Sequence, residues 1–250
     1  MISKTHTKYI QSLQHKKFRD AYRVFIAEGP KVVTELLTAA KFNCREIYAA
    51  KDWLDENSAF LSRFAIPVIE EVKEAELEKI SALSSPHKVL AVFDQAFENS
   101  SGFTKGAVTL ALDTIQDPGN FGTIIRIADW FGIEHIVCAQ GCADMYSPKV
   151  VQSTMGSLSR IHIHYTDLAG WLQQQDAVKI YGADMNGKDI RQLKPLQEGI
   201  IVIGNEGHGM QEAVRARINE FISILGRGRT ESLNAAVATG IILSHLTGTV

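Results

Sequence analysis

The sequence predicts an α/β protein in which a small α/β domain precedes a larger domain with a mostly parallel sheet. Its 250 residues are enough for two domains. From residue 107 onward, apolar segments of strand length alternate with helical segments, which favours parallel strands with helices on both faces. Residues 95–106 (QAFENSSGFTKG) have the composition of a linker. We therefore expect a first domain over residues 1–98, a linker over 99–106 and a second domain over 107–250.

The first domain is expected to mix helices and strands. EGPKVVTELLTAA reads as a helix, because Pro30 is tolerated in a first turn and four apolar residues share one face. These residues are Val32, Val33, Leu36 and Leu37. The other predicted elements are the short strands EIYAA and IPVIE, the amphipathic helix EAELEKISAL and the buried strand HKVLAVFD.

The second domain is expected to contain six strands and five helices. The predicted strands are AVTLALDTI, HIVCA, RIHIHY, VKIYGAD, GIIVIG and FISILG. The predicted helices are a segment that opens near Thr123, PKVVQSTM, DLAGWLQQ, MQEAVRAR and a last helix over about residues 233–246. The last helix is apolar nearly all round, so we expect it to be buried against the sheet or against a second subunit.

Composition places the chain among ordinary soluble globular proteins, with 45% hydrophobic and 22% charged residues. The N-terminus lacks the apolar core of a signal peptide, and no stretch approaches the ~20 apolar residues of a membrane span. Three cysteines are too few for a disulfide framework, and Cys138 and Cys142 have no second pair of ligands for zinc. A cytoplasmic protein without a metal or a membrane anchor is expected.

The first 31 residues are basic, although the net charge of the whole chain is -2. Seven cations stand there against Asp20 and Glu28: Lys4, Lys8, Lys16, Lys17, Arg19, Arg23 and Lys31. Such a run is commonly only a solvated helix, and it becomes a candidate for binding an anionic partner if other parts of the chain indicate one.

Three predicted strand ends lead into unusual loops, and ligands of such sheets bind at the carboxyl ends of the strands. In QDPGNFG, Asn120 offers amide groups, and Arg126 follows in the first turn of the helix expected from Thr123. A cation is disfavoured there by the helix dipole unless an anion lies in front of the helix. The alternative is an ordinary strand-to-helix turn with a surface arginine.

The second and third loops are VIGNEGHGM and SILGRGRTESLN. The second brings three glycines together with Glu206, and its spacing is not that of a dinucleotide site. A carboxylate there suits a cationic or neutral ligand, and His208 is expected to be an exposed loop residue. In the third, Ser232 is a candidate cap of the last helix, which leaves Asn234 unexplained.

Together, in this order, the three loops resemble the SpoU class of SPOUT RNA methyltransferases. The first motif matches DPGNFGTIIRIADWFG, the second GNEGHG and the third ESLNAAVA, with a family-like STMG between the first and second. The resemblance covers residues 107–246. The N-terminal segment more weakly resembles the ribosomal-protein-like substrate-binding domain of rRNA-modifying members. One departure is that Ile224-Leu225 stands where the family often has Ile-Pro.

The resemblance implies transfer of a methyl group from S-adenosylmethionine to a ribose 2′-hydroxyl of RNA, with rRNA favoured over tRNA. It also implies a deep C-terminal trefoil knot and a homodimer formed through the C-terminal domain, whose active site uses both subunits. The cofactor contacts that it implies are Gly204, Asn205, Gly207, Ile224 and Leu233.

The catalytic residues carried over from the family are Asn120, Arg126, Glu206, Ser232 and Asn234. Arg126 would meet the phosphate of the target nucleotide, and we favour electrostatic activation over proton abstraction because arginine stays protonated. The asparagines and Ser232 would orient the ribose or the arginine. Glu206 would either hold the loops together or stabilise the cationic cofactor. Phosphate contacts are then expected from Lys4, Lys8, Lys16, Lys17, Arg19 and Arg23.

Three alternatives stay open at this point. One is a tRNA 2′-O-methyltransferase. Another is an NAD(P)-dependent oxidoreductase, against which stand the glycine spacing and the absence of an acidic residue placed to bind a ribose. The last is an RNA-binding protein that has kept the fold without the activity.

Overall fold

The computed structural model describes residues 2–83, 85–96, 103 and 105–248. It forms two compact units, and the second segment of unit 1 interrupts unit 2 in sequence. Unit 1 comprises Met1–Phe97 and Asp144–Arg160, and unit 2 comprises Glu98–Ala143 and Ile161–Val250. Most of the predicted linker, residues 99–102 and 104, lies outside the described residues. Among the described residues, no helix is long and apolar enough to cross a membrane.

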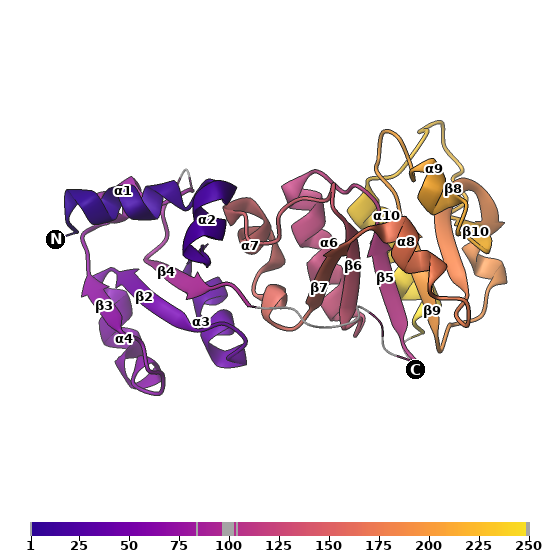
Figure 1. Ribbon diagram of the computed structural model, residues 1–250. Coiled ribbons are helices and arrows are strands. Elements are labelled where there is room, and N and C mark those ends of the chain that lie inside the picture. Colours follow the sequence, from indigo (N-terminus) through magenta and orange to yellow (C-terminus); the bar gives the residue numbers. More distant parts are fainter. Residues whose placement is uncertain (1, 84, 97–102, 104, 249–250) are drawn as a thin grey trace. The chain divides into compact units, whose positions relative to one another are not determined.

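Unit 1 is built on a four-stranded mixed sheet with the order β1-β4-β2-β3 (Figure 1). The central strand β4 is antiparallel to β1 and β2, and β3 is parallel to β2. The strands are β1 (Val24–Glu28), β2 (Cys44–Ala49), β3 (Val68–Glu71) and β4 (Val89–Asp94). The helices are α1 (Lys4–Ser12), α2 (Lys16–Tyr22), α3 (Pro30–Ala39), α4 (Lys51–Leu61), α5 (Glu74–Ile80), α7 (Pro148–Thr154) and the 3-10 turn η1 (Ser157–Ser159).

The helix predicted around Pro30 is confirmed as α3. Pro30 occupies its first turn, and the four predicted apolar residues are buried. Strands β2, β3 and β4 and helix α5 also form where the sequence predicts them. Strand β1 was not predicted, although all five of its residues are buried.

The segment Asp144–Arg160 packs with unit 1, although the predicted boundary assigns it to the second domain. The ring of Tyr146 stacks on Phe25 of β1 with a centroid distance of 4.8 Å, and α7 packs against β1. A buried ion pair joins the Arg19 guanidinium to the Asp144 carboxylate at 2.5 Å. These contacts explain why an amphipathic segment from the middle of the sequence belongs to unit 1.

Unit 2 is built on a six-stranded sheet with the order β10-β8-β9-β5-β6-β7, in which every neighbouring pair is parallel (Figure 1). The strands are β5 (Val108–Leu112), β6 (His135–Ala139), β7 (His162–Thr166), β8 (Ile180–Asp189), β9 (Gly199–Ile203) and β10 (Glu220–Ser223). The helices are α6 (Pro118–Trp130), α8 (Leu168–Gln173), α9 (Glu212–Arg215), α10 (Ala235–Leu246) and the 3-10 turn η2 (Ile190–Gln192). The predicted parallel α/β arrangement is confirmed.

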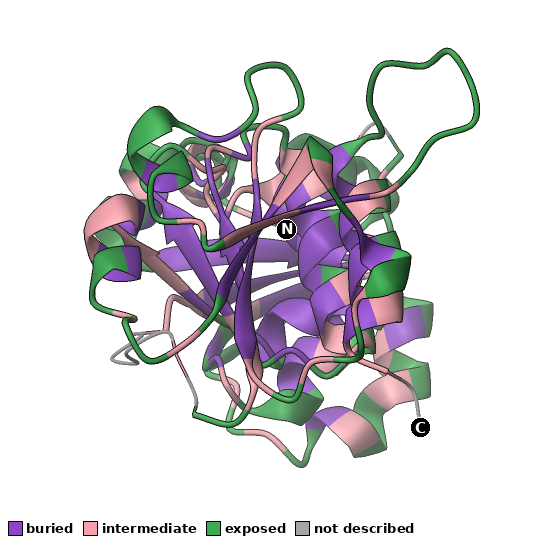
Figure 2. Ribbon diagram, turned by 90° about the vertical axis from the view of Figure 1, so that its right-hand side faces the viewer, coloured by how far each residue is buried: buried purple, intermediate pink, exposed green. Residues whose placement is uncertain are grey.

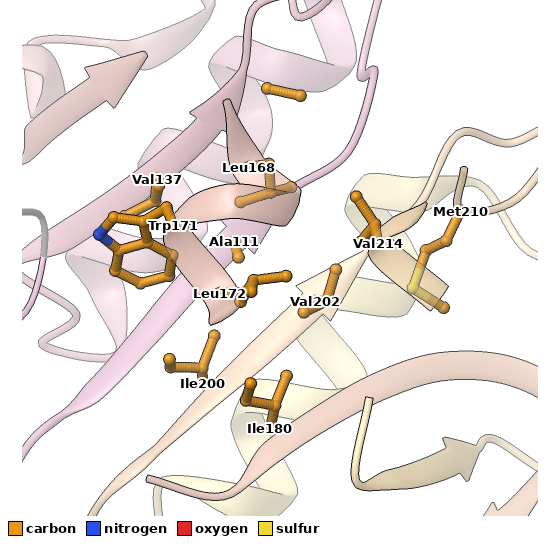
Figure 3. Packing of buried hydrophobic residues seen from close by; sticks show 11 residues of the cluster. Ala111, Val137, Leu168, Trp171, Leu172, Ile180, Ile200, Val202, Met210 and Val214 are labelled. Atoms are coloured by element: carbon orange, nitrogen blue, oxygen red, sulfur yellow. The ribbon is translucent and has the colours of Figure 1, made fainter. Parts of the chain in front are cut away.

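Helices cover both faces of this sheet. Apolar residues of α8 and α9 pack on one face, where Trp171, Leu172 and Val214 belong to one buried cluster with Ala111 and Val202 of the strands (Figure 3). Helices α6 and α10 pack against each other on the opposite face (Figure 1). The burial colours of Figure 2 show buried strands enclosed by helices whose outer sides are exposed. Since the strands are parallel, all their carboxyl ends meet at one edge of the sheet.

Candidate active site

Three loops extend from the carboxyl ends of β5, β9 and β10. They span residues 113–117, 204–211 and 224–234, and they are the segments that the sequence singled out. Strand β9 pairs with β5 and β8, and β8 pairs with β10. The fold therefore carries the three motifs to the same edge of the sheet, as expected for ligand sites in parallel α/β sheets.

One carboxylate joins the three motifs. Oε1 of Glu206 accepts hydrogen bonds from Nδ2 of Asn120, from Nδ2 of Asn234 at 3.3 Å and from the backbone N–H of Ala235 at 3.2 Å. Nδ2 of Asn234 also donates to Oδ1 of Asn120 at 2.9 Å. These hydrogen bonds fit the first of the two roles considered for Glu206, which is to hold the loops together.

Asn234, and not Ser232, caps the last helix. Its Oδ1 accepts hydrogen bonds from the backbone N–H groups of Ala236 at 3.0 Å and Val237 at 3.2 Å. The prediction for Ser232 is wrong because α10 begins at Ala235, two residues later than expected. Ser232 lies exposed in the preceding loop. Asn234 thus combines a cap with a hydrogen bond to the first motif.

Helix α6 begins five residues earlier than predicted. Asp117 caps it by accepting a hydrogen bond from the backbone N–H of Asn120 at 2.8 Å, and Pro118 stands in its first turn. Arg126 is therefore nine positions into the helix, so the dipole argument made for a first-turn arginine is wrong. Aspartate followed by proline is a strong helix-start signal that could have located this end.

The guanidinium of Arg126 is exposed and makes no hydrogen bond or ion pair with any residue that the structure describes. It is six residues beyond Asn120, which in an α-helix is about 9 Å along the axis and roughly 120° around it. Arg126 and Asn120 therefore point in different directions from the same helix. Asn120 is hydrogen-bonded to Glu206 and Asn234, a group of three residues called the Glu206 cluster below, and Arg126 points away from it.

The glycines of the second motif shape a closed loop. Asn205 and Gly209 pair their backbone N–H and C=O groups in both directions at 2.9 Å. A Cβ atom on Gly204 would lie 2.6 Å from the carbonyl carbon of Gly209. Any larger residue at position 204 would therefore clash with the backbone of the same loop. Oδ1 of Asn205 accepts from the N–H groups of Gly207 and His208, and its Nδ2 donates to the carbonyl of Thr114 at 2.8 Å. The side chain of Asn205 thus has a loop-forming role that sequence did not predict.

The third loop presents apolar side chains to solvent. Leu225 and Leu233 are 55% and 45% exposed, and Ile224 before them is half-buried. Glycines 226 and 228 have no atom within 4 Å of a Cβ position. The third loop therefore exposes apolar side chains at the same edge of the sheet from which the Glu206 loop extends.

The basic residues of unit 1 divide into two groups. Lys4, Lys8, Lys16, Lys17 and Arg23 are exposed on or beside α1 and α2. Arg19 is only 2% exposed, and its Nη1 donates to the carbonyls of Leu13 and Gln14 while its Nη2 pairs with Asp144. The expected phosphate contact of Arg19 is therefore wrong, because its charge is used inside the fold.

The cysteines are placed as predicted, at and just beyond the end of β6. Cys138 is fully buried and Cys142 is half-buried, and the thiol of Cys142 donates a hydrogen bond to the carbonyl of Leu112 at 3.3 Å. Among the described residues, no group of three or more His, Cys, Asp or Glu side chains could hold a metal ion.

Two family models match this chain, each over a different segment. The model of the SpoU rRNA methylase family covers residues 107–244, which is more than half of the chain. The chain belongs to the SpoU rRNA methylase family. The model of an MRM3-like substrate-binding domain covers residues 4–91. The oxidoreductase alternative has no place in this family.

Individual relatives of this SpoU family protein match along nearly its whole length. The 23S rRNA (guanosine(2553)-2′-O)-methyltransferase RlmP of Bacillus subtilis is 29% identical over 241 residues, which is 95% of this chain and 94% of the relative. A solved structure of an AdoMet-bound rRNA methyltransferase from Sinorhizobium meliloti has a TM-score of 0.85 and 30% identity, covering 98% and 95% of the two chains. A TrmH-family structure from Porphyromonas gingivalis has a TM-score of 0.84 and 34% identity, covering 98% and 97%.

Proposed function

We propose that this protein transfers the methyl group of S-adenosylmethionine to the 2′-hydroxyl of a ribose in ribosomal RNA. The Glu206 cluster carries the proposal, because it draws one residue from each of the three motifs into a single hydrogen-bonded group. The whole-length similarity to a 23S rRNA 2′-O-methyltransferase supports the substrate. The similarity to an AdoMet-bound enzyme supports the cofactor.

The residues present fit a sulfonium cofactor. Leu225 and Leu233 expose apolar surface that suits an adenine ring, and the backbone groups of Gly204, Ile224 and Leu233 are the expected hydrogen-bonding partners. Glu206 supplies a negative charge, which favours a cationic ligand over an anionic one. When bound, S-adenosylmethionine supplies a methyl group on positively charged sulfur, which an oxygen nucleophile can attack in line.

Arg126 is the residue that we assign to the incoming RNA. Its guanidinium can form a bidentate contact with the phosphate beside the target ribose, and it lacks a competing carboxylate in the described chain. Because arginine keeps its proton, its role is to position the nucleotide and to stabilise negative charge on the attacking oxygen. Because Arg126 keeps its own proton, the proton of the ribose hydroxyl would leave to solvent. Asn120 and Asn234 orient the ribose from the Glu206 cluster.

A homodimer would bring these groups together. Trp130 is four residues beyond Arg126 on the same face of α6 and is 84% exposed. Val237 and Ile241 of α10, the helix packed against α6, are 51% and 39% exposed. Exposed apolar side chains on two neighbouring helices favour association with a second copy. Arg126 would then reach the Glu206 cluster of the partner subunit.

RNA binding is assigned to the exposed cations of unit 1, namely Lys4, Lys8, Lys16, Lys17 and Arg23. Such contacts depend on charge and not on sequence, so they are expected to weaken as salt is added. A trefoil knot around β10 and α10 and a cytoplasmic location remain parts of the proposal that follow from the family resemblance.

The experiment that tests the function is a map of 2′-O-methylated nucleotides in cellular RNA, with and without the gene. We expect one rRNA mark to disappear, to return with the wild-type gene and to stay absent with Arg126→Ala. A lost mark in tRNA would overturn the rRNA assignment. An unchanged map would overturn the methyltransferase proposal.

A further inference from the structure

A cavity of about 220 Å³ lies between the loops that follow β5 and β9. Thr114 and Gln116 line it from the first loop, and His208, Met210 and Gln211 line it from the second. Its lining residues are close in sequence to the Glu206 cluster. Gln116 is four residues before Asn120, and His208 is two residues after Glu206. The proposal below concerns this cavity and rests on the proposed function.

The walls of the cavity are held in place by a buried carboxylate. Asp113 is fully buried, and its oxygens accept hydrogen bonds from the backbone N–H of Gln211 at 2.6 Å, from Nε2 of Gln211 at 2.7 Å and from Oγ1 of Thr114 at 2.9 Å. Thr114 has a φ of 58°, in the left-handed region that β-branched residues avoid. Strain of this kind persists where the surrounding structure fixes it, and it is common at functional sites.

The cavity has an apolar wall at Met210. Met210 is 7% exposed and belongs to the core cluster of unit 2, together with Val202 and Val214 (Figure 3). An apolar wall among polar ones suits a flat aromatic ring that carries hydrogen-bonding groups on its edge.

The rim of the cavity carries polar groups without partners. Gln116 and His208 are exposed, and their side chains make no hydrogen bond with any residue that the structure describes. Gln211 uses its Nε2 on Asp113, which leaves its Oε1 as a further acceptor. Donors and acceptors are therefore both available, since a glutamine amide provides both and a neutral imidazole provides one of each.

The size of the cavity limits what it can hold. Pockets that enclose drug-sized ligands measure roughly 300–1,000 Å³, so 220 Å³ accommodates one ring system and not a whole nucleotide or cofactor. None of its lining residues belongs to the third loop, where the apolar surface for the cofactor lies. We propose that the cavity takes the base of the nucleotide whose ribose is methylated, with Gln116 and His208 bonding to its edge. Enzymes that select a nucleotide in RNA commonly read an unstacked base in this way.

The first test compares Gln116→Ala with the wild type and with Gln174→Ala, a matched control on an exposed glutamine at the end of α8. The substrates are four synthetic RNAs around the mapped nucleotide, each with a different base at that position. We expect Gln116→Ala to lose at least about tenfold in kcat/KM on the native base and to discriminate less among the four, because it removes a hydrogen bond to the edge of the base. Affinity for S-adenosylmethionine and thermal stability are expected to stay at wild-type values, as in Gln174→Ala.

Two results would overturn the proposal. One is that Gln116→Ala matches the wild type on all four RNAs while Arg126→Ala is inactive. The other is a loss of affinity for S-adenosylmethionine in Gln116→Ala, which would assign the cavity to the cofactor.

A second test does not depend on methyl transfer. The ring resonances of His208 are followed by NMR during titration with AMP, CMP, GMP and UMP at millimolar concentrations. We expect saturable shifts that differ among the four bases and that are lost in Gln116→Ala. Shifts in a protein that methylates no RNA would refute the proposed function and leave the base pocket standing, whereas unchanged resonances would refute the pocket.

Discussion

The side chain of Asn234 donates a hydrogen bond of 2.9 Å to the side chain of Asn120, which is 114 residues earlier in the sequence. Asn120 in turn donates to Glu206, so the orientation of its amide is fixed by partners on both sides. The start of α10, the start of α6 and the loop after β9 are therefore coupled. A change in one of these residues is expected to displace the others.

Two substitutions of Glu206 separate the effect of its hydrogen bonds from the effect of its charge. Glu206→Gln keeps an oxygen that can accept the same three hydrogen bonds, whereas Glu206→Ala removes it. If holding the loops is its main role, Glu206→Ala should lower kcat by about 100-fold and Glu206→Gln by less than about tenfold, because misplaced catalytic groups cost that order of rate. Steady-state methyl transfer measures both. Equal losses in the two variants would show that the charge itself is needed beside the cofactor.

Asn234 is expected to contribute to stability and activity through different atoms. Asn234→Ala removes the cap of α10 and should lower the free energy of unfolding by about 1 kcal/mol. Asn234→Ser keeps a capping oxygen but lacks the amide that donates to Asn120, so it should keep most of the stability and still lose activity. Urea unfolding and methyl-transfer assays check the two effects. Full activity in Asn234→Ser would contradict the link to Asn120.

The composite site predicts complementation between two inactive variants. Arg126→Ala and Asn234→Ala are each expected to be inactive as homodimers. If Arg126 acts on the partner's Glu206 cluster, half of the dimers in an equal mixture will carry one intact site, which gives about a quarter of the wild-type activity. The assay requires subunits that are mixed in denaturant and refolded together. Absence of recovery, with mixed dimers detected, would place both residues in one subunit's site.

Arg19 is predicted to affect stability instead of RNA binding. Arg19→Ala leaves the largely buried Asp144 carboxylate without its cationic partner, and such a loss typically costs about 3–5 kcal/mol. Lys17→Ala, on the exposed side of the same helix, should leave stability unchanged and weaken RNA binding at low salt. Urea unfolding and binding to protein-free rRNA measure the two quantities. A loss of RNA affinity without a loss of stability in Arg19→Ala would refute the assignment.

The stability of the protein is expected to depend on pH through Glu28 of unit 1. Burial raises the pKa of its carboxyl above 4.5, although Ser81 and the backbone N–H of Ala82 donate hydrogen bonds to it. The folded state therefore binds more protons than the unfolded state above pH 4.5, so this group's contribution to stability is lost as pH rises through the raised pKa. Glu28→Gln should lack this loss, and its stability relative to the wild type should increase from acidic to neutral pH. Urea unfolding at several pH values measures the difference, and a constant difference would contradict the prediction.

Much of the fold is predictable because burial leaves a periodic pattern. Strand β9 is a continuous apolar run, and β5 is apolar except for the buried Thr109, as is typical of parallel strands covered on both faces. The start of α6 is missed because Gly122 is taken as the beginning of the helix, although Asp117-Pro118 is the stronger signal. The place of α7 is not predictable at all, because an amphipathic pattern shows that a helix has a buried face without showing what covers it.

The sequence identifies some residues of the site but not the contacts between them. Motif order identifies Asn120, Glu206 and Asn234 as a group, but no local pattern reveals that Glu206 is their common acceptor, since the contacts span 28 to 114 residues. The burial of Arg19 is also hidden, because it lies in a run of cations that are otherwise exposed. The same is true of Asp113, whose partner Gln211 is 98 residues away.

The connection from β6 to β7 makes the two units interdependent. The chain passes between them three times, after residues 97, 143 and 160, so a cleavage within residues 99–106 would not yield two intact pieces. The C-terminal fragment would take α7 with it, exposing the buried Val150 and Val151 and removing the cover of β1. Recombination at that single junction would therefore not exchange one substrate-binding region for another. Only an exchange that also replaced residues 144–160 would preserve both cores.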